Sequence, residues 1–200
     1  MKNTALIFPQ KDVDVQNYYW FKEGFDVNAL NKIYQDVSIL PFMEAGTGDN
    51  NNKDKNVRSS KIKWIPQQEK WEWVYAKLMG MIIEANNALW NFDLVSILDN
   101  IQYTEYHAED GGHYEWHQDF GPGWLSKRKI SVTVQLSSPE EYEGGDLEYW
   151  KGGPIENVDK CPKGKGVVFI FPSYMMHRVT PVTKGVRRSF VLWVGGTSFK

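Results

Sequence analysis

The sequence predicts an α+β fold that is mainly β, a β-barrel or jelly roll backed by N-terminal helices. Helical periodicity is confined to the residues before Asn91, whereas short apolar runs separated by Gly and Pro fill the rest of the chain. A length of 200 residues suits one domain with one core. We expect residues 1–94 to supply helical support and a mobile loop, and 95–200 to supply the jelly-roll core.

The composition excludes several classes of protein. Hydrophobic residues make up 42% and charged residues 24%, as in globular proteins. No apolar run approaches the ~20 residues of a membrane helix, and the N-terminal run 5–8 is shorter than the core of a signal peptide. The net charge of -2 argues against a nucleic-acid partner. Cys161 is the only cysteine, so we expect no intrachain disulfide and a cytoplasmic location.

Two helices are predicted in the first half. The first predicted helix spans residues 26–40. Asp26 is its candidate N-cap, its apolar side chains recur at helical spacing, and Pro41 ends it. Residues 68–91 form the stronger helix, whose apolar stripe should lie against a sheet. That stripe contains Trp71, Tyr75, Leu78, Met79, Ile82, Ile83 and Leu89.

Residues 44–57 are rich in Gly and Asn and predict a mobile loop, and a flap that includes the basic residues would span 44–63. Two interpretations stay open for the basic residues between 53 and 63. They form the solvated edge of the loop, or they belong to a mobile flap that faces the substrate.

The second half predicts about seven short strands. Ile130, Val132 and Val134 alternate with polar residues, and 167–171 is a continuous apolar run typical of a buried strand. The expected strand segments are 95–106, 113–119, 129–136, 145–150, 166–171, 175–180 and 187–194.

The histidines suggest a metal site. His107, His113 and His117 each precede an acidic residue by two positions, a spacing that places both side chains on one face of a strand. His113 and His117 would lie about 13 Å apart on a strand at 3.3 Å per residue, too far to share an ion. We choose His117 with Asp119, because this pair ends a strand just before a Gly-Pro-Gly turn.

His177 is the expected third ligand, 58 residues after Asp119 and beyond a buried strand. Two histidines and one carboxylate suit non-haem Fe(II) with open coordination positions. Zn(II) with one water is the competing metal. Ten residues after His177 comes Arg187. It either faces solvent or is buried, and a buried Arg would need an anionic partner such as a carboxylate.

Four segments resemble one enzyme family. Gly111-x-x-Tyr114-x-x-His117-x-Asp119 is similar to its metal-ligand strand, and 131–147 with the Gly144-Gly145-Asp146-Leu147 hairpin is similar to its middle strand. Residues 166–177 are similar to its third-ligand segment, and 177–189 to its cosubstrate-binding strand. This family is the Fe(II)/2-oxoglutarate-dependent dioxygenases, in particular the prolyl 4-hydroxylase-like group with the bacterial PKHD-type hydroxylases. The segment Arg58-Ser59-Ser60-x-x-x-Trp64 resembles a less specific N-terminal element.

The resemblance implies a double-stranded β-helix with His117, Asp119 and His177 on Fe(II), and with Arg187 on the distal carboxylate of 2-oxoglutarate. It also implies a cosubstrate-facing tyrosine, for which Tyr106 and Tyr103 compete. Gln135 takes the place of an aromatic contact to the cosubstrate. O₂ is the second cosubstrate, and ascorbate is a further candidate cofactor.

The implied reaction oxidises 2-oxoglutarate to succinate and CO₂ and hydroxylates an unactivated C–H bond. A peptidyl proline is the first expected substrate, and a free amino acid or other small molecule is the alternative. Trp116, Trp124 and Trp150 could pack a proline ring or belong to the scaffold. A non-catalytic metal-binding jelly roll is the alternative of another class, but it would have no reason to keep Arg187. A nucleic-acid demethylase of the same superfamily would need a basic groove. No feature of the sequence indicates an oligomeric state.

Overall fold

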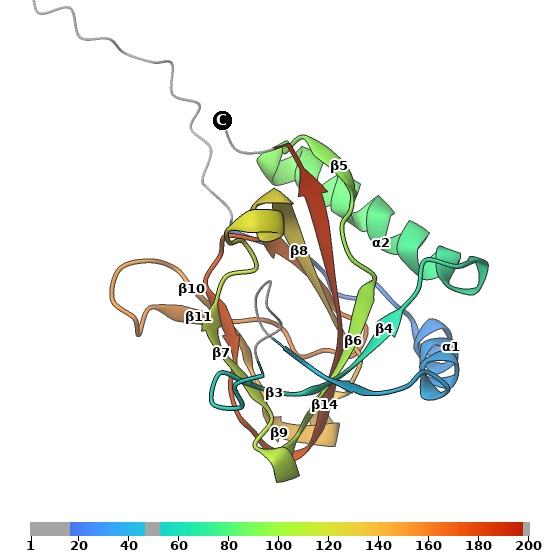
Figure 1. The fold of residues 1–200 in the computed structure, drawn as a ribbon, viewed down its shortest axis with the longest axis vertical. Helices are drawn as coiled ribbons and strands as arrows, with labels where there is room; N and C mark the ends of the chain where they lie inside the picture. The colour runs from blue at the N-terminus through green and yellow to red at the C-terminus, as the bar shows by residue number, and fades with distance from the viewer. Residues whose placement is uncertain (1–16, 47–52, 198–200) are drawn as a thin grey trace, which may run out of the picture.

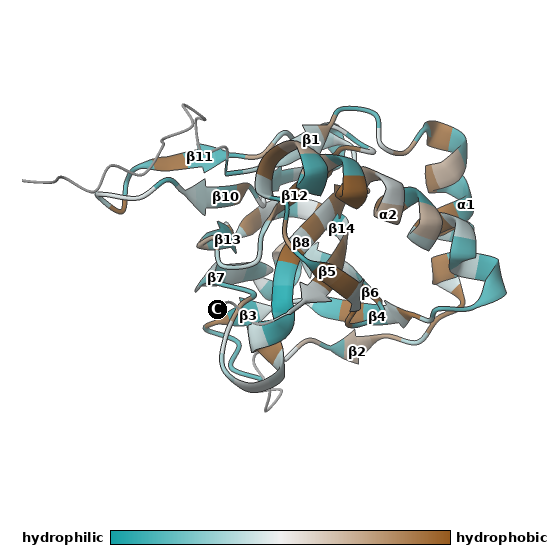
Figure 2. Cartoon of the chain, turned by 90° about the horizontal axis from the view of Figure 1, so that it is seen from above, coloured by the Kyte–Doolittle hydropathy of each residue, from teal (hydrophilic) through white to brown (hydrophobic). Residues whose placement is uncertain are grey.

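Two antiparallel β-sheets face each other in the structure, a computed structural model that describes residues 17–46 and 53–197. Both helices cover the outer face of the larger sheet, so the layers run helices, large sheet, small sheet (Figures 1 and 2). This confirms the predicted fold class, a mainly β jelly roll with helical support.

The larger sheet has nine strands, in the order β1-β12-β8-β14-β6-β4-β2, with β5 and β9 also paired to β14. Its strands are β1 (Tyr19–Phe21), β2 (Met43–Glu44), β4 (Lys61–Ile65), β5 (Leu94–Ile97), β6 (Ile101–His107), β8 (Arg128–Gln135), β9 (Tyr142–Gly144), β12 (Val168–Pro172) and β14 (Val182–Gly196). The smaller sheet has the order β11-β10-β13-β7-β3. Its strands are β3 (Arg58–Ser59), β7 (His113–His117), β10 (Leu147–Trp150), β11 (Val158–Lys160) and β13 (His177–Val179).

The two predicted helices are confirmed. Helix α1 (Val27–Ser38) begins after Asp26, whose Oδ1 accepts the amide of Ala29 at 2.8 Å. Helix α2 (Glu72–Ala85) follows a short 3₁₀ turn, Glu69–Trp71, and continues into a π-turn, Asn86–Trp90. In the described residues, neither helix has the length and apolar character needed to cross a membrane.

The main core lies between the helices and the large sheet. Most of the predicted apolar stripe on α2 is buried there, but Ile83 is 51% exposed, so its assignment to the core was wrong. Strand alternation divides β8 cleanly. Ile130, Val132 and Val134 face the helices, while the odd-numbered residues face the space between the sheets.

The predicted strand segments are present, with two differences. Residues 95–106 contain two strands, β5 and β6, separated at 98–100. The short strands β1, β2, β3, β4, β9 and β11 were not predicted.

Residues 47–52 of the predicted loop 44–57 lie outside the described residues. The flap interpretation extends to residue 63, and its last residues belong to the strands β3 and β4. Lys63 resembles a surface residue in the sequence, yet it is only 5% exposed and its Nζ donates to the carbonyl of Val37 at the end of α1. Residues 61–64 alternate polar and apolar side chains as in a half-exposed strand, but both faces of β4 are largely covered, so Lys63 lies inside the fold.

Candidate metal and cosubstrate site

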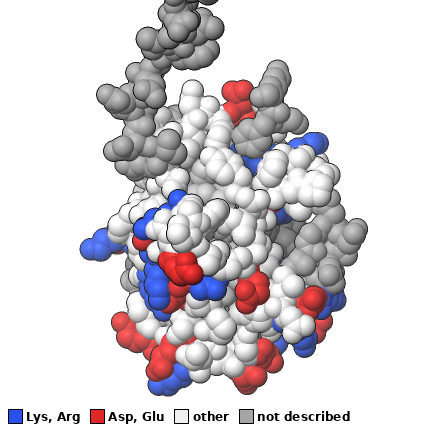
Figure 3. Space-filling model, turned by 90° about the vertical axis from the view of Figure 1, so that its left-hand side faces the viewer, with Lys and Arg blue, Asp and Glu red and all other residues white. Residues whose placement is uncertain are grey.

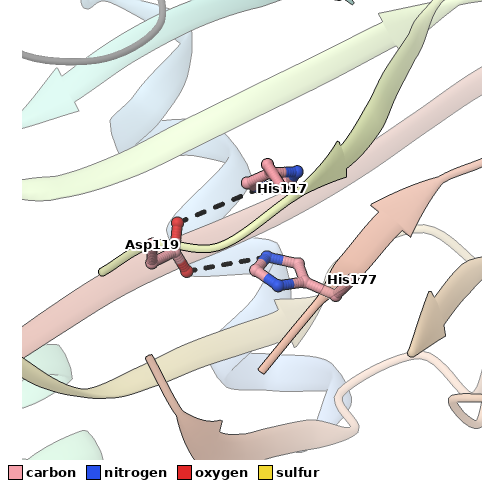
Figure 4. Close-up of side chains that lie close together, drawn as sticks. All are labelled: His117, Asp119 and His177. Atoms are coloured by element: carbon pink, nitrogen blue, oxygen red, sulfur yellow. Dashed lines mark ion pairs between the residues drawn. The ribbon is translucent and has the colours of Figure 1, made fainter. Parts of the chain in front are cut away.

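Strand pairing in the small sheet brings together two histidines distant in sequence. His117 ends β7, His177 begins β13, and the two residues are paired in register. Asp119 follows β7 by two residues, and its amide donates to the carbonyl of Ser173 at 3.0 Å. The three side chains point toward one another (Figure 4).

The ligand atoms of these residues all lie within 4.8 Å of one another. Nε2 of His117 is 4.0 Å from Oδ1 of Asp119, and Nε2 of His177 is 3.6 Å from Oδ2. Each histidine uses Nδ1 to donate to a backbone carbonyl, His117 to Glu115 at 2.7 Å and His177 to Met175 at 2.8 Å. The Nε2 lone pairs are therefore free for an ion between them.

The electrostatics of this group suit a divalent cation. Burial, followed by the charge of His177, lowers the pKa of His117 to about 3. Burial alone would raise the pKa of Asp119, but His177 and His117 outweigh it and lower that pKa. A neutral imidazole and an ionised carboxylate are the forms that bind a metal.

The other histidines lie outside this group. His107 Nε2 bonds Glu105 at 2.7 Å on the opposite sheet. Both ring nitrogens of His113 contact backbone carbonyls, those of Gly111 and Asn56. Among the described residues, His117, Asp119 and His177 form the one cluster with metal-ligand geometry.

Arg187 lines the same cavity from the large sheet and is only 1% exposed. Its Nη2 donates to Oε1 of Gln135 at 2.7 Å and its Nη1 to Ser189 at 3.4 Å, while its buried Nε has no hydrogen-bond partner in the described structure. Both partners are neutral, so the guanidinium charge is buried without compensation. A ligand carboxylate in the cavity would satisfy both the charge and the unused N–H.

Two assignments of cosubstrate contacts need correction. Tyr106 pairs with Arg187 in register and lines the cavity. Tyr103 lies an odd number of residues away, so it faces the helices, where its hydroxyl donates to Glu105 at 2.5 Å. Gln135 lies behind Arg187, and its amide also donates to the Tyr142 hydroxyl at 3.3 Å, so it orients the guanidinium and does not line the cavity.

Of the three tryptophans that are candidate substrate contacts, one lies at the site. Trp124 is 47% exposed and lines a groove that opens at His117. Trp116 lies under the guanidinium of Arg178 at 4.7 Å. Trp150 donates from its ring nitrogen to the carbonyl of Pro154.

One charged residue of the site was missed. Arg58, on β3, is 8% exposed and lines both the cavity and the groove. In the sequence it is one of several basic residues between 53 and 63, so its charge gave no signal. The resemblance of Arg58-Ser59-Ser60-x-x-x-Trp64 to a family element was the only available hint.

Comparison with known proteins agrees with this geometry. A family model described as the 2OG-Fe(II) oxygenase superfamily matches residues 101–195. A PKHD-type hydroxylase of Synechococcus sp. (strain JA-2-3B'a(2-13)) is 36% identical over 177 residues, which cover 84% of this chain and 75% of the relative. Another, from Acidovorax ebreus, is 40% identical over 91 residues, 42% of this chain and 39% of the relative.

Solved structures share the fold. A prolyl hydroxylase of Trichoplax adhaerens, in complex with a peptide of hypoxia inducible factor, has a TM-score of 0.74 at 21% identity, over 90% of this chain and 84% of that one. A Pseudomonas putida prolyl-4-hydroxylase has a TM-score of 0.66 at 17% identity, over 90% and 92%. Sequence match, fold and buried His-Asp-His cluster together place the chain in the 2OG-Fe(II) oxygenase superfamily, as a dioxygenase related to the PKHD-type hydroxylases.

Proposed function

We propose that His117, Asp119 and His177 bind one Fe(II), and that Arg187 binds the distal carboxylate of 2-oxoglutarate. The observation that carries this proposal is the buried guanidinium of Arg187, which lacks a carboxylate partner among the described residues and lines the cavity of the three ligands. A non-catalytic metal-binding jelly roll would gain nothing from such a charge. The orphaned Nε and the donor set both fit the two groups that the family uses.

With these groups bound, the chemistry supplied is the coupled oxidation of 2-oxoglutarate to succinate and CO₂ and of a substrate C–H to C–OH by O₂. The chain's own residues position the bound groups and exclude water from the cavity. Arg187 and Tyr106 line the cavity from the large sheet, and the two imidazoles and the carboxylate line it as well. Residues of both sheets meet at this site, which supports the proposal that the chain is one dioxygenase domain.

We propose a peptidyl proline as substrate, in line with the names of the structural neighbours, one of which holds a peptide. A free amino acid is the second candidate. On the face shown in Figure 3, acidic and basic side chains lie next to one another. Ion pairs of this kind join Arg178 with Glu148 and Lys160 with Asp146. Charges mixed in this way do not form, on this face, the basic stripe that a nucleic-acid substrate would require.

The test is turnover under controlled loading. The protein is given Fe(II) and 2-oxoglutarate without oxygen and then exposed to air, and succinate is measured with and without a panel of proline-containing peptides and free amino acids. Succinate above the His117→Ala background supports the dioxygenase, and a peptide that raises succinate and gains one oxygen atom supports peptidyl proline. Stimulation by free amino acids alone would select the second candidate. If the Fe(II)-loaded protein forms no succinate with any of the substrates tested, the proposed activity is refuted.

A further inference from the structure

The cavity of the three ligands continues into a more open groove. The two share Arg58, Gln102, Tyr114, His117, Asp119 and Trp193. The remainder of the groove is largely apolar, with walls that include Met43, Ile62, Trp64, Trp124 and Leu125. Because it reaches the ligand cluster from outside, this groove is the path along which a substrate would approach.

Most charges around this groove have partners. Arg128 Nη2 lies 2.8 Å from Oδ2 of Asp99, and its guanidinium is 4.0 Å from the centre of the Trp193 ring. Asp119 is committed to the ligand cluster. Glu44 is exposed and lies 4.0 Å from the amine of Lys53.

Arg58 differs from these charges. Its Nη2 donates to Oε1 of Gln102 at 2.6 Å, its Nε to Ser60 at 3.0 Å and its Nη1 to the carbonyl of Gly46 at 3.3 Å. All three acceptors are neutral, and no carboxylate in the described part of the chain pairs with it. Five N–H groups are available on a guanidinium, so donors remain for a ligand.

The position of Arg58 relative to the ligand cluster is defined by two ring contacts. Its guanidinium carbon is 4.7 Å from the centre of the Tyr114 ring, which stacks on the His117 ring at 3.4 Å. The cation is thus one aromatic ring away from a ligand histidine. An 8% exposed guanidinium at this place is expensive unless an anion completes it.

We propose that Arg58 binds a carboxylate of the primary substrate in this groove. The inference rests on the proposed dioxygenase function and specifies its substrate chemistry. The substrate carries an anionic group near the ligand cluster and an apolar portion that lies along the tryptophans of the groove. An acidic side chain next to a peptidyl proline and the free carboxylate of an amino acid both present this group. The planar fork of Arg suits either source bidentately.

The experiment measures equilibrium binding by tryptophan fluorescence, with protein loaded anaerobically with Fe(II) and 2-oxoglutarate. One arm compares capped proline peptides that carry Glu or Gln next to the proline, and the other compares free proline with prolinamide. We expect the wild type to bind the acid of at least one pair about tenfold more tightly, or about 1.4 kcal/mol. In Arg58→Gln this preference should fall below about threefold, and in Arg58→Lys it should be intermediate, because charge is kept and the fork is lost.

Lys61→Gln is the matched control, since Lys61 is a nearby half-buried cation paired with Asp110 and does not line the groove. It should keep the wild-type preference. Retained 2-oxoglutarate binding in each variant shows that the site is folded, and if Arg58→Gln does not fold, Arg58→Lys decides. A wild type without acid preference in either arm, or a preference that survives both Arg58 substitutions, overturns the inference. So does an Arg58 variant that loses 2-oxoglutarate as Arg187→Ala does while its substrate preference is unchanged. Failure of the dioxygenase itself is separate, since it shows as absent metal or 2-oxoglutarate binding.

Discussion

The Ser131 hydroxyl donates to Oδ2 of Asp119 at 2.7 Å, from the large sheet to the candidate ligand that follows β7 of the small one. Ser131 lies on β8 and is fully buried, and its oxygen is also 2.9 Å from that of Ser173. This bond fixes the rotation of the carboxylate, so that it faces the two imidazoles. With the metal bound as proposed, Ser131 would be a positioning residue.

Replacement of Ser131 should loosen the metal site without removing a ligand. Loss of a hydrogen bond to a ligating carboxylate typically lowers metal affinity by about 10- to 100-fold. We therefore expect Ser131→Ala to lower the affinity for Fe(II) by a factor of that order. Anaerobic titration with Fe(II) measures the effect. Ser126→Ala, which removes an exposed hydroxyl bonded to Gly123, should bind the metal like the wild type. Equal affinity in Ser131→Ala and Ser126→Ala would show that the carboxylate needs no such support.

The choice of histidine pair gives a second prediction. His117→Ala should abolish Fe(II) binding, because Nε2 of His117 faces the cluster. His113→Ala should keep it, because both of its ring nitrogens are engaged with backbone carbonyls. Metal content after reconstitution distinguishes the variants. A loss as complete in His113→Ala as in His117→Ala would mean that the wrong pair was chosen.

The neighbouring residues Arg187 and Arg188 give a third prediction. Arg187→Ala should weaken the binding of 2-oxoglutarate at least tenfold, or about 1.4 kcal/mol. Of the two arginines, Arg187 is the one whose side chain lines the cavity. Arg187→Lys should fall between it and the wild type, because Lys keeps the charge but not the fork. Arg188→Ala should leave the affinity unchanged, because Arg188 faces the other way and pairs with Glu105 at 3.2 Å. The dissociation constant comes from the absorbance of the anaerobic Fe(II)–cosubstrate complex, and a larger effect at Arg188 would contradict this strand register.

Local spacing explains why the clustering of His117, Asp119 and His177 could be predicted. His117 and Asp119 are neighbours on one strand face, and His177 follows a recognisable buried strand and turn, so both signals are readable within about ten residues. It was harder to predict which face of the sheet each side chain of a strand points to. Tyr103 and Tyr106 fit the sequence pattern almost equally, and only the pairing of Tyr106 with Arg187 shows which one faces the cavity.

Arg58 could not be assigned from local pattern at all. Its strand is two residues long, and its place depends on pairing with β7 across more than fifty residues of chain. Buried lysine and arginine in such short strands resemble a solvated loop in the sequence, because their neutralisation comes from distant carbonyls, amides or ligands.

The last prediction concerns Glu105, a buried carboxylate on β6 that faces away from the cavity. Burial by itself would raise its pKa, but hydrogen bonds from Tyr103 and His107 and the charge of Arg188 together lower it below 4.5. Lys61 and Lys63 on neighbouring β4 add positive charge on the same side.

A pKa that is lower in the folded state means that the ionised carboxylate stabilises the fold above pH 4.5. This contribution is lost as the pH falls through the folded-state pKa, where the folded protein takes up its proton. Glu105→Gln should therefore reduce the free energy of unfolding at pH 7 by about 1.5–3 kcal/mol, the range for hydrogen bonds to a charged group. The difference from the wild type should shrink when urea unfolding is repeated at about pH 3 to 4. Glu109→Gln is the matched control, because Glu109 is 76% exposed and lies 3.8 Å from the same His107, so its effect should be small at both pH values. A Glu105→Gln deficit that stays constant with pH would mean that the side chain contributes shape and hydrogen bonding, and that its charge contributes nothing to the stability of the fold.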